Sequence, residues 1–381
     1  MLTVGAGLAV TALAMGRQSL AGRPVQVKMT HYPVPKDNGW YGYVQAANSL
    51  ADTSPSVDES YGEARRLQGL TEVVKANSKA IAVFNGAVAK ECFSPLPEAP
   101  DGPIPLYAPL RNLSRLMVLV GRDYEGRAQY EDAFRTYGDI VKFANDLCRG
   151  GVLTQRLTGD AVRYMALHEV RIALDQGHFD ARALQALVPR LLAPRVPLAD
   201  TLAWHWAYEK ALLRYAVAEE AEKPTHEVLR LPKGVTMEQA MAAYERATAA
   251  LIQHAALPYW QAVRVKAPKG PLGMKHVGTF GELYRKVRVA EASDEASVRG
   301  TLLVVALELY RLRQGAYPES LDALVPDYLP EMPLDPFAGK AFRYRRTDDN
   351  FRLYSVGQNM KDDGGVEPKP GKAGTGDLVF R

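Results

Sequence analysis

The sequence predicts a mainly α-helical protein, with an irregular helical-hairpin domain over residues 18–291 and a smaller module over residues 292–381. Through the first domain, apolar residues recur at intervals of three and four, which is the spacing of one helix face, and no convincing pair of strands is found. From residue 297 onward the pattern changes, since one helical run is followed by segments rich in Tyr, Pro, Asp and Gly. The chain is therefore divided into two unequal parts.

The composition is that of an ordinary globular protein and gives no sign of nucleic-acid binding. Hydrophobic residues make up 47% and charged residues 24% of the chain, which is typical of an ordinary globular protein. The balance of 47 basic and 43 acidic residues, without a dense basic stripe, does not indicate nucleic-acid binding. Cys92 and Cys148 form neither a disulfide framework nor a metal motif. They could pair in an oxidising compartment, but two buried thiols are the favoured interpretation.

The N-terminal segment, residues 1–17, contains an uncharged apolar run from Leu2 to Met15. This run is shorter than the roughly 20 residues that a membrane-spanning helix needs, and it has no positively charged leader. Two interpretations compete: a truncated membrane anchor or signal segment, and an ordinary buried helix. The first interpretation predicts a protein of the cell envelope, in contact with the membrane through this segment and facing the periplasm or the exterior, or secreted.

The helical domain begins after a short extended stretch. Asp37 and Asn38 offer an N-cap for the first helix, whose apolar residues from Trp40 to Leu50 have helical spacing. Prolines between Phe93 and Pro109 interrupt the helices, because proline lacks a backbone donor and clashes inside a helix. The further helices are predicted near Tyr61–Val74, Ser78–Glu91, Leu110–Val120, Tyr130–Leu147, Thr158–Asp175, Ala181–Val188, Leu198–Ala221 and Met237–Leu257.

Two of these helices, Leu110–Val120 and Tyr130–Leu147, are predicted to form an antiparallel pair around a turn at residues 121–126. The placement of Ala128, Ala133 and Phe134 resembles one tetratricopeptide-type pair, with a small residue where the helices cross closely. No clean second copy occurs at a 34-residue period. A tetratricopeptide-like hairpin is therefore predicted, whereas a regular solenoid is not.

No catalytic cluster is evident in the helical domain. The second histidine of a zinc-protease helix beginning at His168 is missing, since Ile172 occupies its position. His205 lies between two tryptophans, a pattern more typical of packing than of a ligand. The nucleophile elbow, the phosphate-binding Gly-Lys loop and paired cysteines are also absent from the sequence. We therefore predict a protein that is not an enzyme; the alternative is an enzyme with a site near His168, Glu169, His205 and Glu209.

The C-terminal module carries an ordered set of residues after a helix at Arg299–Gln314. These are Leu309-Tyr310, Gly315, Tyr317-Pro318, Leu321, Leu324, Tyr328-Leu329, Asp335-Pro336, Tyr344, Tyr354-Ser355, Gly357, Gly364-Gly365 and Asp377. In order and spacing this set resembles the globular domain of the major pseudopilin of type II secretion systems. The resemblance covers residues 297–381 and implies a small α+β module, a long helix packed on a three-stranded antiparallel sheet. The strands would be Ala341–Arg346, Phe351–Val356 and Leu378–Phe380.

The pseudopilin family binds calcium in the loop after its last long strand, so the resemblance implies calcium as a cofactor. Calcium takes six to eight oxygen ligands, and this loop contains carboxylates, an amide and glycines that allow tight turns. Two departures weaken the match, the neutral Asn359 and the insertion Val366–Gly374. The alternative is an Asp/Gly turn without a metal. The implied ligand residues are Ser355, Asn359, Asp362, Asp363 and Asp377, with Asp362 or Asp363 and Asp377 as the carboxylates.

These features together predict a non-enzymatic scaffold or binding protein of the cell envelope, with protein partners there. The resemblance also implies a link to a secretion or pilus-like assembly. A working pseudopilin carries its membrane helix directly before this module, whereas here the helical domain precedes it. Polymerisation by the family's usual route is therefore not expected, because a shared fold does not carry a function with it. A further alternative is that the module only stabilises a helical domain whose concave surface binds a peptide.

Overall fold

The computed structural model describes residues 6–10, 29–51, 69–95, 107–220, 236–266, 280–369 and 374–381. It confirms a mainly helical protein with a small three-stranded antiparallel sheet near the C-terminus. The described helices are α1 (Gly39–Asn48), α3 (Leu70–Ala76), α4 (Ser78–Val88), α5 (Tyr107–Gly126), α6 (Tyr130–Cys148), α7 (Leu153–Asp175), α8 (Ala181–Leu192), α9 (Leu198–Glu220), α10 (Met237–Ala255), α11 (Tyr259–Ala262) and α12 (Phe280–Gln314).

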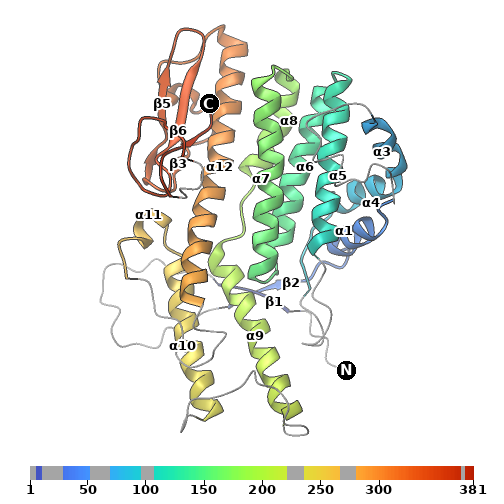
Figure 1. Ribbon diagram of the computed structural model, residues 1–381, viewed down its shortest axis with the longest axis vertical. Coiled ribbons are helices and arrows are strands. Elements are labelled where there is room, and N and C mark those ends of the chain that lie inside the picture. Colours follow the sequence, from blue (N-terminus) through green and yellow to red (C-terminus); the bar gives the residue numbers. More distant parts are fainter. Residues whose placement is uncertain are drawn as a thin grey trace.

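Helices α5, α6, α7 and α8 form the centre of the molecule (Figure 1). Helices α1, α3 and α4 pack beside α5, while α12 packs against α7 and α8. Helices α9 and α10 pair with each other and extend away from the central helices. The small sheet lies against the C-terminal half of α12, so α12 contacts both parts of the chain.

Helix α1 begins at the predicted cap. The Oδ1 atom of Asn38 accepts a hydrogen bond from the Trp40 backbone N–H at 3.1 Å, satisfying a donor that the helix itself leaves open. The Asn38 amide also donates to the Phe93 carbonyl at 2.7 Å. One side chain therefore starts α1 and holds the segment that follows α4.

The predicted turn at residues 121–126 is wrong, because α5 continues to Gly126 and the turn is only three residues long. Gly121 lies inside α5, where a Cβ atom would come within 2.3 Å of the Tyr137 ring. This glycine permits close helix packing rather than a turn. The chain reverses instead at Ala128, which adopts the left-handed conformation with φ 57°.

Helix α12 is much longer than predicted. It begins at Phe280 instead of Arg299, so the predicted domain boundary between residues 291 and 292 falls within a helix. Gly300 allows close packing here, since an added Cβ would lie 2.5 Å from the Phe380 ring. The helix ends at Gly315, whose φ of 81° is typical of a C-terminal cap.

The C-terminal module contains the three predicted strands. Strand β6 (Phe351–Ser355) pairs antiparallel with β5 (Arg343–Arg346) on one side and with β7 (Leu378–Val379) on the other. A further short pair joins β3 (Leu334–Asp335) to β4 (Lys340–Ala341). The buried Glu308 of α12 accepts hydrogen bonds from the Tyr317 hydroxyl at 2.8 Å and from Arg381, which fastens the end of the chain to α12.

Part of the N-terminal apolar run is extended. Residues Ala6–Val10 form β1, which pairs antiparallel with β2 (Met29–Pro33). The buried-helix interpretation is wrong for these five residues, because so short an apolar stretch cannot be assigned by periodicity. Strand β2 was not predicted as a strand. The rest of the run lies outside the described residues. None of the described helices has both the length and the hydropathy needed to cross a membrane.

Both cysteines are buried free thiols, as the favoured interpretation expected. Burial is the main cause that raises the pKa of Cys148, to about 11, and burial also raises the pKa of Cys92. Both side chains are therefore protonated near neutral pH and react slowly with thiol reagents.

Replacing Gly300 by alanine should lower the free energy of unfolding by about 1–2 kcal/mol, because the new methyl group collides with the Phe380 ring. Gly86 is a matched control in α4, since an added Cβ there meets no atom within 4 Å. Gly86→Ala should raise stability by about 0.5–1 kcal/mol through the helix propensity of alanine. Urea unfolding of both variants checks this; equal effects at the two sites would contradict the packing argument.

Candidate functional site

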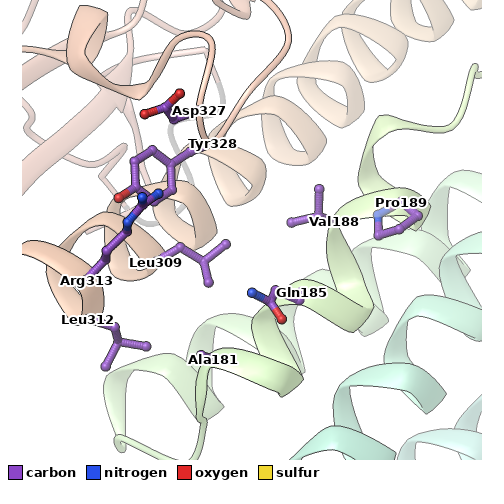
Figure 2. Close-up of a pocket in the computed structure, with 9 residues that line it drawn as sticks. All are labelled: Ala181, Gln185, Val188, Pro189, Leu309, Leu312, Arg313, Asp327 and Tyr328. Atoms are coloured by element: carbon purple, nitrogen blue, oxygen red, sulfur yellow. The ribbon is translucent and has the colours of Figure 1, made fainter.

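A groove of about 530 Å³ lies between α8 and α12. One wall comes from the central helices, and the other comes from α12 together with the turn that follows the 3-10 helix Leu321–Leu324 (Figure 2). Both parts of the chain therefore build it. The lining residues are Ala181, Gln185, Val188, Pro189, Leu309, Leu312, Arg313, Asp327 and Tyr328.

Helix α8 presents one face to this groove. Its N-terminus is capped by Asp180, whose Oδ1 accepts from the Ala183 N–H at 2.8 Å. The helix was predicted to end at Val188, but α8 continues through Pro189 to Leu192. Because proline has no N–H, the carbonyl of Gln185 loses the helical hydrogen bond that residue 189 would otherwise donate. The groove wall therefore contains a backbone acceptor without its helical donor.

The opposite wall combines apolar surface with polar groups. Leu312 is 46% exposed although it belongs to the same apolar stripe as the half-buried Leu309. The Tyr328 ring packs on Tyr310 at a centroid distance of 5.4 Å. Its hydroxyl oxygen is buried and has no hydrogen-bond partner within the described residues. An unpaired buried hydroxyl is costly, so a ligand that reaches this oxygen would gain a hydrogen bond.

The charges at the groove are Arg313 and Asp327, both on exposed positions. Arg311 is turned to Glu308, with its Nε 2.8 Å from a carboxylate oxygen. Arg313 makes no ion pair with any described residue. The groove therefore offers apolar walls with a few polar groups at the rim, which suits an apolar ligand segment rather than acid–base chemistry.

A buried ionic network fixes α12 beside the central helices. Arg163 of α7 is 1% exposed and donates to Asp160 at 3.1 Å and to Asp294 of α12. Arg195, in the link between α8 and α9, also donates to Asp294. The third donor of Arg163 goes to Asn145 of α6 at 2.8 Å. Asp294 is thus the point where α7, α12 and the link after α8 are joined.

The same network extends toward the start of α12. Arg156, 1% exposed, lies 3.5 Å from Glu291 and donates to the Val196 carbonyl at 2.8 Å. Arg288 donates to Glu291 at 2.5 Å and to the carbonyl of Leu257 at 2.7 Å. Four arginines thus meet three carboxylates in a volume that excludes most water.

Asp160 is the carboxyl group of this network whose ionised form is disfavoured by its surroundings. Burial is the first cause that raises its pKa, and the negative charge of Asp294 is the second, while the neighbouring arginines lower it. Burial and a like charge both disfavour the ionised carboxylate. The Arg163 pKa is raised, because the attraction of Asp294 and the other acidic groups outweighs the opposing effect of burial. Arg163 therefore stays charged, while the pKa of the Asp160 carboxyl is raised.

The predicted calcium residues lie in one loop, but each already has partners. Asp377 is fully buried, and its two oxygens accept from the N–H groups of Asp363 at 3.3 Å and Gly365 at 2.7 Å. Ser355 is also buried and donates to Asp335 at 2.8 Å. These bonds fold the loop back onto β6.

Of the other predicted ligands, Asp362 and Asp363 are exposed and Asn359 is half-buried. Asp362 accepts from the Tyr354 hydroxyl at 2.9 Å and from Arg343 at 2.8 Å, and these contacts lower its pKa. Asp363 accepts from the Asn359 amide at 2.6 Å. Across the described ranges, His, Cys, Asp and Glu side chains form no group of three or more suited to a metal ion. The carboxylate oxygens of Asp362, Asp363 and Asp377 thus already accept hydrogen bonds within the loop, and calcium binding stays a prediction from the resemblance.

The residues of the enzymatic alternative lie in different surroundings. His168 is exposed and stacks on Tyr164, whereas the adjacent Glu169 is buried and pairs with Arg122 of α5 at 2.8 Å. His205 is on α9, where burial lowers its pKa to about 4. The side chain of Glu209 is outside the described part. None of His168, Glu169 and His205 lines the groove between α8 and α12.

Sequence reasoning found the apolar positions of the groove but not the groove itself. Leu309 and Leu312 have the helical spacing that identified the last helix. Only the tertiary contact of α8 with α12 brings them opposite Val188, more than 100 positions earlier in the chain. The one local signal was Pro189 within an apolar-periodic run, which marks a backbone carbonyl without a helical donor.

The chain was compared with protein-family models, curated proteins and solved structures, and none of them matches it. The pseudopilin-like character of the C-terminal module therefore stays a prediction from its residues.

Asp294→Asn should lower the free energy of unfolding by about 3–5 kcal/mol, because it leaves the buried Arg163 and the half-buried Arg195 without their shared carboxylate. Asp160→Asn is the matched control and should cost little at pH 7. The raised native pKa of Asp160 means that its contribution to stability is present below the unfolded pKa of about 4 and lost as the pH rises through the native value. The free energy of unfolding of the Asp160→Asn variant, relative to that of the original protein, should therefore increase from pH 4 to pH 7.

Urea unfolding of the full chain at several pH values measures both variants. Equal destabilisation by the two substitutions at pH 7 would contradict the distinct roles assigned to Asp294 and Asp160.

If the calcium prediction is right, millimolar calcium raises the melting temperature of the full chain and a chelator reverses the change. Binding requires Arg343 to leave Asp362, so Arg343→Gln should enlarge the shift. Asp363→Asn should reduce it. A melting temperature that calcium leaves unchanged in all three proteins would contradict the prediction.

Proposed function

We propose that this protein is a non-enzymatic scaffold or binding protein, and that the groove between α8 and α12 is where a protein partner binds. The observation that carries the proposal is that both parts of the chain contribute a wall to one open, partly apolar groove. An exposed apolar surface rimmed by polar groups is typical of an interaction site. Neither wall would form the site alone.

The ionic network supports a role as a scaffold. Asp294 and Glu291 tie α12 to α7 and to the segments around it through buried charged hydrogen bonds. Such bonds hold a defined geometry, because breaking one of them leaves a buried charge unpaired. A partner would therefore meet a groove that is already formed, and binding would require little reorganisation.

We further propose the cell envelope as the location. The support is the apolar run in residues 1–17 and the resemblance of the C-terminal module to a pseudopilin domain. A link to a secretion or pilus-like assembly follows from the same resemblance. The partner would then be another envelope protein.

The binding proposal is tested by placing a photoreactive amino acid at Gln185 in the groove and, as a control, at Tyr41 on α1, which is 62% exposed. In intact cells, position 185 should crosslink to one defined protein and position 41 should not. Leu312→Glu, which puts a charge on the opposite wall, should abolish the crosslink at position 185. Equal crosslinking at both positions, or none at position 185, would contradict the proposal.

The location is tested with a membrane-impermeant maleimide. Cys92 and Cys148 are buried and should stay unlabelled, so a Tyr41→Cys variant provides one accessible thiol. Labelling of this variant in intact cells with an opened outer barrier, but an intact inner membrane, is the expected result. Labelling only after the cells are lysed would contradict an envelope location.

A further inference from the structure

The two walls of the groove carry apolar stripes of helical spacing. On α8 the stripe includes Ala181, Val188 and Leu192, and the last of these is 43% exposed. On α12 it includes Leu309 and the exposed Leu312. Figure 2 shows Val188 and Leu309 pointing toward each other across the space between the two helices, and Leu192 lies beyond the residues that line the groove. Surface stripes of this kind on neighbouring helices leave a position where a third helix can pack.

We propose that the groove binds an amphipathic helix of a protein partner, about three turns long, with an acidic residue placed to reach Arg313. This inference rests on the proposed function and adds the chemistry of the bound segment. The length follows from α8, since eleven steps from Ala181 to Leu192 at about 1.5 Å each span about 16 Å.

Backbone chemistry favours a helix over an extended segment. A helix satisfies its own N–H and C=O groups, whereas an extended peptide needs partners for them. Helices α8 and α12 bond their backbones internally, and Pro189 opens only the single carbonyl of Gln185. The walls therefore cannot pair with a strand. Recognition of a helix in a groove uses apolar residues at positions i, i+3 or i+4, and i+7.

Arg313 favours an acidic residue of the bound helix next to it, whereas Asp327, which also lines the groove, disfavours an acidic residue at its own position. The partial positive charge at the start of α8 is offset by the capping carboxylate of Asp180. Arg313 is available for the contact, since it carries no ion pair with a described residue, whereas Arg311 and Arg190 are paired with Glu308 and Asp139. An exposed ion pair contributes little affinity, so this contact mainly sets the direction of the bound helix.

Two polar groups add further specificity. The buried Tyr328 hydroxyl has no hydrogen-bond partner among the described residues, and the Gln185 carbonyl lacks the helical donor that residue 189 would otherwise supply. A side chain of the bound helix that donates to either oxygen would form a hydrogen bond. A hydrophobic helix without polar residues on its flanks would leave both oxygens desolvated and is therefore disfavoured.

The test uses a library of random 14-residue peptides displayed on phage and selected on the purified full chain. Counter-selection uses the Leu312→Glu variant, and Leu334→Glu is the matched control because Leu334 is similarly exposed, at 47%, outside the groove. Enriched peptides should have apolar residues at helical spacing and an Asp or Glu near one end. They should bind the Leu334→Glu variant as tightly as the original chain and the Leu312→Glu variant at least about tenfold more weakly, because a charge replaces apolar contact.

The acidic residue is tested with the best synthetic peptide. Arg313→Glu should weaken binding about two- to fivefold in fluorescence anisotropy, and exchanging the peptide's acidic residue for arginine should restore it. Gln185→Arg, a second groove variant at an exposed position, should also weaken binding. Circular dichroism of each variant checks that its fold is unchanged.

Three results would overturn the inference: no enrichment over the counter-selection, enriched peptides without helical spacing, or binding that is insensitive to Arg313→Glu. Self-association of the chain that depends on Leu312 would instead assign the groove to a second copy and would also overturn it. Crosslinking at position 185 in cells, combined with any of these results, would leave the proposed function standing while the helix proposal fails.

Discussion

The arrangement of the molecule depends on a set of charges taken out of water. Arg156 and Arg163 are each 1% exposed, and both must find carboxylates in the protein because burying an unpaired charge is prohibitive. Those carboxylates are Asp160 on the same helix and Glu291 and Asp294 on α12. Helix α12 can therefore not shift along α7 without separating buried ions. The apolar contacts favour association of the helices, but the ionic network selects one register.

A single register matters because α12 serves two parts of the chain. Its N-terminal half supplies Glu291 and Asp294 to the central helices, and its C-terminal half supplies Glu308, which holds Arg381. The same helix also carries Gly300, where the Phe380 ring closes onto the helix. The groove lies where α12 passes α8. The distance between the two walls of the groove is therefore set by buried bonds outside it. The residues that line the groove themselves form few hydrogen bonds or ion pairs.

The sequence predicted what depends on local pattern. Apolar spacing located most of the helices, Asn38 was identified as a cap, and the three C-terminal strands lie where the pseudopilin resemblance placed them. It failed where a residue's role is set by a distant partner. Gly121 resembles a turn residue but makes room for Tyr137. The last helix was predicted to begin at Arg299, which leaves out the first turns of α12, where Arg288 is buried. The groove was out of reach for the same reason, because its walls are joined only by the tertiary fold.

The two candidate sites, the C-terminal loop and the groove, differ in whether their buried polar groups already have hydrogen-bond partners. In the C-terminal loop, the buried Asp335 and Asp377 each accept at least two hydrogen bonds from the module itself. That loop is complete in its present form, and a ligand would have to compete with existing bonds. At the groove, the Tyr328 hydroxyl has no described partner, and Pro189 removes a donor nearby. Leu312 is exposed there as well. A partner that binds as we propose would therefore gain both apolar burial and new hydrogen bonds at the groove, and this difference is the physical reason to propose the groove rather than the C-terminal loop.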